Sequence, residues 1–278
     1  MKKIENIAEV RKVQLGILDY VDSFCKSHNI IYYLCGGTML GAIRHKGYIP
    51  WDDDIDIMMP RKDYEVFLRE FSASDTSFYG LVEHRVQRNY PYPFAKVEDS
   101  RTFLKEHFDD AFDQGINIDI FPLDSMPKGK ENYTPFIEKR IKYKKYLHLK
   151  EDNFFKLSFE DGLGKFFNTI YRNVKLALQK VYLCGYSITK LVDLLDENGQ
   201  KATAAGSPAY MGNFTWGYAY KELCPIENFK EIIEVEFEGK MYPAPKGYDV
   251  YLSGLFGNYM QLPPEGQRTT HSFDAFWK

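Results

Sequence analysis

Two aspartates, Asp54 and Asp56, lie one residue apart shortly after a Gly-Gly-Thr turn. The segment Asp52–Met59 alternates acidic and apolar residues, which is the two-residue period of a β-strand. In such a strand both carboxylates share one face, while Ile55 and Ile57 enter the core from the other. Neighbouring carboxylates repel each other, and a divalent cation removes that cost. The pattern therefore favours a fold that holds a hard cation such as Mg²⁺ at this strand.

The turn before this strand consists of Gly36, Gly37 and Thr38. It follows Ile30–Cys35, a β-branched and aromatic segment that is typical of a buried strand. Thr38 is expected to cap a short helix over Met39–Arg44. Because glycine has no Cβ, a phosphate can approach the backbone N–H groups where the helix begins. We therefore expect a phosphate pocket beside the metal site.

A third carboxylate lies farther along the chain, at Asp119 in the alternating segment 115–121. If its strand lies beside the first, the three aspartates can hold one or two Mg²⁺ ions, or Mn²⁺ in their place. Such ions clamp a transferring phosphoryl group, and Asp119 could also accept the proton of an attacking hydroxyl. An isolated Asp-x-Asp is more often a solvated turn, but the glycine turn and the third carboxylate favour catalysis. Asp52 and Asp53 are expected to support the strand, with Asp53 facing away.

Other patterns along the chain alternate between helical and extended periods. We predict helices over residues 5–28, 63–71, 131–150, 163–195 and 248–256. We predict further strands over residues 78–85, 94–98 and 232–237, a connector over 151–162, and loops over 204–217 and 262–271. These patterns indicate a mixed α/β protein with a helical middle.

Composition excludes several classes of protein. The chain has 278 residues with 44% hydrophobic and 27% charged residues, as in a globular protein rather than a disordered one. A net charge of −3 argues against a protein that binds nucleic acid by electrostatics. The four cysteines form no CxxC pair, which argues against a zinc site. The charged segment 1–11 lacks a signal core and no stretch resembles a membrane span, so we expect a cytoplasmic protein.

Three blocks of the sequence resemble the LicD family. The run Tyr33–Ile57 is similar to the defining block of that family, and Asp119–Asp124 is similar to its second block. The C-terminal match comprises Tyr251-Leu252, Gly257-Asn258-Tyr259-Met260, Pro263-Pro264, Arg268 and His271. Asn258 stands where the family often has aspartate.

The resemblance implies a nucleotidyltransferase-type fold, an α/β (α+β) protein with a mixed β-sheet core flanked by helices. It implies a catalytic core over residues 1–124 and 225–278, and a mostly helical insertion over 125–224 that binds the acceptor or choline. The implied reaction is the magnesium-dependent transfer of phosphocholine from CDP-choline to a sugar hydroxyl, with release of CMP. The implied acceptor is a surface glycan, specifically a lipid-linked teichoic acid precursor at the inner face of the plasma membrane.

Basic residues near the motif have two interpretations each. Arg44, His45 and Lys46 could hold the diphosphate of the donor, or form a solvated helix end where cations are favoured. Lys96, in a predicted strand, could neutralise phosphate charge or reach solvent.

Further residues are candidates for donor or acceptor contacts. Trp51 could stack on a base or face the choline ammonium, and Trp216, with Tyr218 and Tyr220, could make cation–π contacts with choline. Core packing is the commoner role for an aromatic residue in this chain. Arg268 and His271 could touch donor phosphates or the acceptor, or anchor the tail.

The predicted helix over 163–195 carries basic residues among apolar ones: Lys165, Arg172, Lys175, Lys180 and Lys190. A basic amphipathic helix can lie on an anionic membrane surface, which would bring the enzyme to a lipid-linked acceptor. An ordinary packed helix with solvated lysines is the alternative.

Three other functions fit parts of the pattern. The donor could be another CDP-linked alcohol such as CDP-ribitol, or a nucleoside triphosphate, in which case pyrophosphate would be released. The chain could also be a non-catalytic glycan-binding protein on the same fold. The intact acidic set argues against a non-catalytic protein, because such a protein has no need to keep mutually repelling carboxylates.

Overall fold

A mixed β-sheet forms the centre of the molecule in the computed structural model, which describes residues 1–74, 78–106, 112–152, 163–268 and 273–278. Within these residues the sheet has nine strands. Its main path is β1 (Lys2–Ile4), β11 (Phe273–Trp277), β5 (Ala95–Glu106), β6 (Gln114–Pro127), β3 (Asp56–Pro60) and β2 (Tyr33–Leu34). The other members are β4 (Tyr79–Val82), which pairs with β5, and β7 (Pro208–Gly212), which pairs with both β6 and β8 (Cys224–Pro225).

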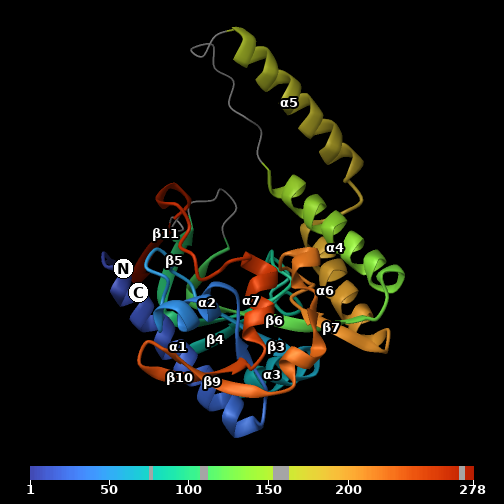
Figure 1. Ribbon diagram of the computed structural model, residues 1–278. Coiled ribbons are helices and arrows are strands. Elements are labelled where there is room, and N and C mark those ends of the chain that lie inside the picture. The colour runs from blue at the N-terminus through green and yellow to red at the C-terminus, as the bar shows by residue number, and fades with distance from the viewer. Residues whose placement is uncertain (75–77, 107–111, 153–162, 269–272) are drawn as a thin grey trace.

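The pairing of β3 with β6 is parallel, whereas their outer neighbours pair antiparallel. The N-terminal strand β1 pairs with the C-terminal strand β11, so the two ends of the chain lie together at one edge of the sheet (Figure 1). The hairpin of β9 (Ile232–Phe237) and β10 (Lys240–Pro245) forms a separate two-stranded sheet.

Three helices precede or follow the acidic strand. α1 (Ile7–His28) begins at Asn6, whose side chain accepts a hydrogen bond from the Ala8 N–H, and ends at Asn29 in a left-handed conformation. α2 (Gly36–His45) connects β2 to the loop before β3, and α3 (Arg61–Ala73) follows β3 directly. Their apolar faces and the sheet form the main core, whose buried side chains include Ile17, Leu34, Met39, Ile57 and Phe67.

The middle of the chain contains α4 (Lys130–Glu151), α5 (Leu163–Tyr182) and α6 (Ile188–Ala204). A buried ion network ties α6 to the sheet, since Arg61 donates to Asp124 at 2.7 Å and to Asp196 at 2.7 Å. Helix α5, in contrast, extends away from the body of the molecule (Figure 1). After the hairpin, α7 (Tyr248–Phe256) is the last of the described α-helices, and a short 3-10 helix (Glu265–Gln267) follows it. No helix among the described residues is both long and apolar enough to cross a membrane.

The predicted α/β class is confirmed, and several local predictions are corrected. The acidic strand begins at Asp56 rather than Asp52. Helix α2 begins at Gly36, so Thr38 lies inside the helix and does not cap it. The helix predicted over 163–195 is two helices, because the helical conformation is interrupted between Tyr182 and Ile188. The predicted loop over 204–217 contains strand β7. Most of the predicted connector, 153–162, lies outside the described residues.

Candidate active site

The parallel pairing of β3 and β6 brings two of the predicted carboxylates together. Asp56 and Asp119 are direct partners in the register of these strands. The Asp119 N–H donates to the Ile55 carbonyl at 2.9 Å, and the Cys35 N–H donates to the Asp56 carbonyl at 3.1 Å. Backbone hydrogen bonds therefore join the three segments that carry the site.

A cavity of about 480 Å³ opens over these strands. Its lining includes the predicted aspartates and glycines together with aromatic residues, namely Gly36, Gly37, Asp54, Asp56, Asp119, Phe121, Trp216, Tyr218, Tyr251 and Phe256. Asp54 precedes β3 rather than lying in it, yet it lines the same cavity as Asp56. The predicted metal ligands and the glycine turn thus share one cavity.

The two glycines make room for carboxylates. A Cβ at Gly36 would lie 3.2 Å from Oδ2 of Asp56, and a Cβ at Gly37 would lie 2.7 Å from Oδ2 of Asp52. Gly36 also has φ +51°, a conformation that favours glycine. The start of α2 carries the partial positive charge of the helix dipole, which stabilises these anionic groups. The space that the sequence suggested for a phosphate is therefore bordered by Asp52 and Asp56.

Thr38 fixes the start of the acidic strand. Its side chain is buried, and Oγ1 accepts a hydrogen bond of 2.8 Å from the Asp56 N–H. Thr38 is absent from the residues that line the cavity. The structure thus shows that Thr38 helps to position Asp56, and its role in phosphate binding stays a prediction.

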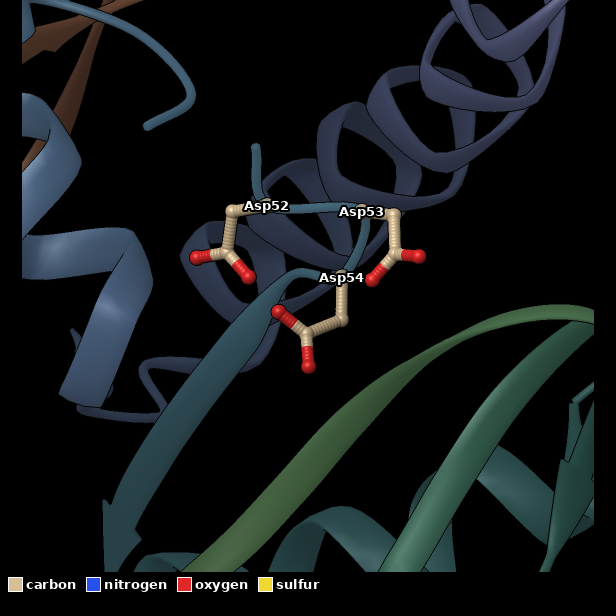
Figure 2. A group of neighbouring side chains, drawn as sticks. All are labelled: Asp52, Asp53 and Asp54. Carbon is tan, nitrogen blue, oxygen red and sulfur yellow. The ribbon is translucent and has the colours of Figure 1, made fainter. Parts of the chain in front are cut away.

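The loop before β3 adds two more carboxylates. Asp52, Asp53 and Asp54 bring potential ligand oxygens within 4.8 Å of one another, and the three side chains leave neighbouring positions of one loop (Figure 2). Helix α1 supports this loop, because Gln14 Nε2 donates to the Asp53 carbonyl at 2.8 Å and Arg11 donates to the Asp52 carbonyl. Within the described part of the chain, this is the group of three acidic side chains whose ligand atoms lie close enough together to hold one metal ion. Asp52 and Asp54 belong both to this trio and to the lining of the cavity.

Negative charge accumulates in this cavity. Burial, and then the charges of Asp54, Asp119 and Asp52, hold the pKa of Asp56 well above its usual range. Mg²⁺ binds oxygen ligands such as carboxylates, and its charge would offset the repulsion between these side chains. The residues present therefore fit this ion. Mg²⁺ dependence itself stays a prediction.

Lys96, on the neighbouring strand β5, offsets part of this negative charge. Its buried ammonium lies 2.5 Å from Oδ1 of Asp119 and donates to Oδ1 of Asn117 at 3.0 Å. Lys96 lines a neighbouring cavity that shares Asp54, Asp119 and Trp216 with the first. The candidate phosphate ligand thus contacts a candidate metal ligand.

The basic residues at the end of α2, Arg44, His45 and Lys46, have different surroundings. Arg44 lines a second cavity of about 800 Å³ and donates to the Tyr259 carbonyl at 2.6 Å and to His45 Nε2 at 2.9 Å. Lys46 ends the helix at φ 58° and forms an ion pair of 3.1 Å with Glu236 on the hairpin. Neither His45 nor Lys46 lines either of these two cavities.

The aromatic candidates lie in different cavities. Trp51 lines the second cavity, with the guanidinium carbon of Arg268 4.9 Å from its ring centroid. Trp216 lines the first, and Lys144 Nζ lies 4.0 Å from its ring centroid. His271 lies outside the described residues. The described candidates thus form a Trp216 group beside the carboxylates and a Trp51 group next to the C-terminal loop.

Glu222 is a cavity residue that the sequence analysis missed. Its buried carboxylate accepts hydrogen bonds from the N–H groups of Asn213 at 3.2 Å and Tyr218 at 2.9 Å. Burial raises its pKa to about 7, although these two hydrogen bonds and the charge of Arg140 oppose the shift. The available signal was its position as a lone acid after the aromatic segment 216–220.

The chain is similar to a protein family and to several known proteins. The model of the LicD/FKTN/FKRP nucleotidyltransferase domain matches residues 29–166. A lipopolysaccharide cholinephosphotransferase, LicD, of Haemophilus influenzae is 31% identical over 280 residues, which cover 98% of this chain and 97% of that protein. Mannosyltransferase regulator 4 of Saccharomyces cerevisiae is 32% identical over 127 residues, 42% of this chain and 10% of that protein. An uncharacterised protein of Rickettsia typhi is 53% identical over 120 residues, 39% of this chain and 37% of that protein.

Proposed function

The chain belongs to the LicD/FKTN/FKRP family, and from this premise we propose that it is a phosphotransferase that moves phosphocholine. In the proposed reaction, CDP-choline donates phosphocholine to a hydroxyl of a surface glycan and CMP is released. The observation that carries the proposal is the convergence of Asp54, Asp56 and Asp119 on one cavity beside the glycine turn. The nearly full-length similarity to a cholinephosphotransferase supports the choice of the transferred group.

In this proposal Asp54 and Asp56 hold Mg²⁺, with Asp119 as the third carboxylate. When bound, the ion would neutralise the charge that develops on the transferring phosphoryl group. Asp119 accepts the proton of the acceptor hydroxyl, and the ammonium of Lys96 at 2.5 Å stabilises its charged form. The start of α2, where Gly36 and Gly37 line the cavity, adds backbone N–H groups and a positive dipole end.

The aromatic wall of the cavity suits the choline headgroup. Trp216, Tyr218, Tyr251 and Phe256 line the cavity together with the carboxylates. The ring of Trp216 already contacts the ammonium of Lys144, so it lies where it can stabilise a cation. A quaternary ammonium over a good ring gains about 0.5–2 kcal/mol. We therefore place choline against this wall and the phosphates against the carboxylate end.

For the acceptor, we propose a chemical class, a sugar hydroxyl of a surface glycan, and no particular glycan. The bacterial relative is named for lipopolysaccharide, whereas the sequence resemblance suggested a lipid-linked teichoic acid precursor. Both are surface glycans that offer sugar hydroxyls, and this shared chemistry is what the proposal requires.

The test is isothermal titration of the purified protein with CDP-choline, with and without Mg²⁺, followed by CMP detection with glycan acceptors. The wild type should bind the donor in an Mg²⁺-dependent manner, and the double variant Asp54→Asn/Asp56→Asn should not. Asp152→Asn, an exposed aspartate after α4, is the matched control and should behave as the wild type.

Other outcomes would overturn specific parts of the proposal. Turnover with CDP-ribitol alone would replace the donor. Release of pyrophosphate from a nucleoside triphosphate would replace the reaction. Glycan binding by a folded protein that binds no nucleotide would indicate a non-catalytic member of the family.

A further inference from the structure

Helix α5 presents a long apolar stripe to solvent. Leu163, Phe167, Tyr171, Val174, Leu178, Val181 and Tyr182 are each between 54% and 74% exposed. From Leu163 to Val181 they recur every three or four residues, which places them along one side of the helix, and Tyr182 extends that side. Of the side chains described in this helix, Leu176 is the one that is fully buried. A contiguous apolar surface of this kind normally marks an interaction site.

The charge on α5 points to the class of partner. Its twenty residues include Lys165, Arg172, Lys175 and Lys180 and no aspartate or glutamate, in a protein whose net charge is −3. Lys165, Arg172 and Lys175 are exposed along with the stripe. A helix with an apolar stripe on one side and basic residues on its polar side fits the boundary between the acyl chains and the headgroups of an anionic bilayer.

The position of α5 leaves this face accessible. The helix extends away from the sheet, whereas α4 and α6 lie against the body of the molecule (Figure 1). Its attachment includes a hydrogen bond of 3.3 Å from Lys180 Nζ to the Lys150 carbonyl of α4. The apolar stripe of this projecting helix, the α5 arm, is therefore open to an external partner.

We propose that α5 binds the surface of an anionic lipid bilayer, with its apolar stripe among the lipid chains and its basic residues among the anionic headgroups. Binding is peripheral, because no described helix can span a membrane. This proposal rests on α5 alone and is independent of the donor or reaction.

Vesicle co-sedimentation tests the proposal with the full chain. The wild type should pellet with vesicles that contain phosphatidylglycerol, much less with pure phosphatidylcholine, and less as salt rises. Phe167→Ser/Leu178→Ser should abolish pelleting. Each basic residue near an anionic surface contributes roughly fivefold to partitioning, so Arg172→Glu/Lys175→Glu should lower it by at least about 25-fold.

Matched controls distinguish the effect of changes in α5 from the effect of similar changes elsewhere on the surface. Val86→Ser/Met241→Ser removes exposed apolar residues elsewhere, and Lys12→Glu/Lys62→Glu makes the same change in net charge. Both should pellet as the wild type does, and circular dichroism should show that all variants fold. Absence of pelleting by the wild type, or equal pelleting by arm and control variants, would overturn the proposal. A dimer in solution that Phe167→Ser/Leu178→Ser converts to monomer would instead assign the stripe to contact between copies.

Discussion

The ammonium of Lys96 lies 2.5 Å from Oδ1 of Asp119, across the antiparallel pairing of β5 and β6. Asp119 is also the register partner of Asp56 on the opposite side of β6, so the lysine and the acidic cluster share one carboxylate. A cation bound at Asp119 must coexist with this ammonium. We therefore expect Lys96 to lower the affinity of the proposed site for Mg²⁺.

Lys96→Gln should tighten Mg²⁺ binding in the absence of donor by at least about tenfold, because one nearby positive charge is removed. Isothermal titration with Mg²⁺ measures this change. Lys105→Gln, at an exposed position on the same strand, is the control and should leave the affinity unchanged. Equal Mg²⁺ affinity in Lys96→Gln and wild type would disconnect Lys96 from the metal site.

The hydrogen bond from the Asp56 N–H to Thr38 Oγ1 yields a second prediction. Thr38→Val keeps the shape of the buried side chain but leaves that N–H without its acceptor, at a cost of about 1–3 kcal/mol in the free energy of unfolding. We expect kcat to fall while KM for CDP-choline changes little. Urea unfolding and steady-state kinetics measure both effects.

Thr38→Ser is the matched control because it retains the hydroxyl, and it should lie close to the wild type in both measurements. If Thr38→Val raised KM for the donor without loss of stability, Thr38 would contact the phosphates after all. The two roles are thus separable in one set of variants.

Gly36 offers a test of the close approach between α2 and Asp56. Gly36→Ala would place a Cβ 3.2 Å from Asp56 Oδ2 and would force an alanine to φ +51°. A mutation in a residue that supports a metal ligand typically lowers metal affinity by about 10–100-fold. We expect Gly36→Ala to have an effect of this size, because the added Cβ would push the Asp56 carboxylate away. Gly239→Ala is the control, since Gly239 has φ +77° but nothing within 4 Å of the added Cβ.

Both glycine variants should lose about 1 kcal/mol of stability through backbone strain. Only Gly36→Ala should weaken Mg²⁺ binding. Equal metal affinity in the two variants would show that the site does not depend on the space at Gly36.

Strong local patterns were predictable from the sequence. The predicted strand over 232–237 and the predicted helix over 248–256 have the bounds of β9 and α7. The alternation around Asp119 identified the centre of β6, and the match to the LicD family is confirmed by the full-length relative. These features depend on side-chain periodicity within one segment, which the sequence carries directly.

Pairings between distant segments were not predictable. β1 is a strand because Lys2 to Ile4 pair with the last residues of the chain, and a three-residue segment has no period of its own.

The break between α5 and α6, in contrast, has a local signal in the sequence, because Ser187 caps α6 by accepting a hydrogen bond from the Lys190 N–H at 3.0 Å. The contact of Trp216 with Lys144 joins a loop to α4, which no spacing in the sequence reveals.

Glu222 should make the stability of the protein depend on pH. Its pKa rises from an ordinary value of 4.5 to about 7 in the folded state because it is buried. A raised pKa means that the folded state holds the proton more tightly than the unfolded state, so stability falls as pH rises from about 4.5 to about 7 and is level above that window. Between pH 5 and pH 8 this residue should remove roughly 2–3 kcal/mol from the free energy of unfolding.

Urea unfolding at several pH values, compared with Glu222→Gln, measures this contribution. Glutamine does not titrate, so the variant should lose less stability than the wild type over the same range, whatever its stability at pH 5. The difference between the two slopes isolates Glu222 from the other titrating groups. Parallel pH profiles for the two proteins would mean that the folded state holds Glu222 at an ordinary pKa, with its charge fully stabilised by the N–H groups of Asn213 and Tyr218.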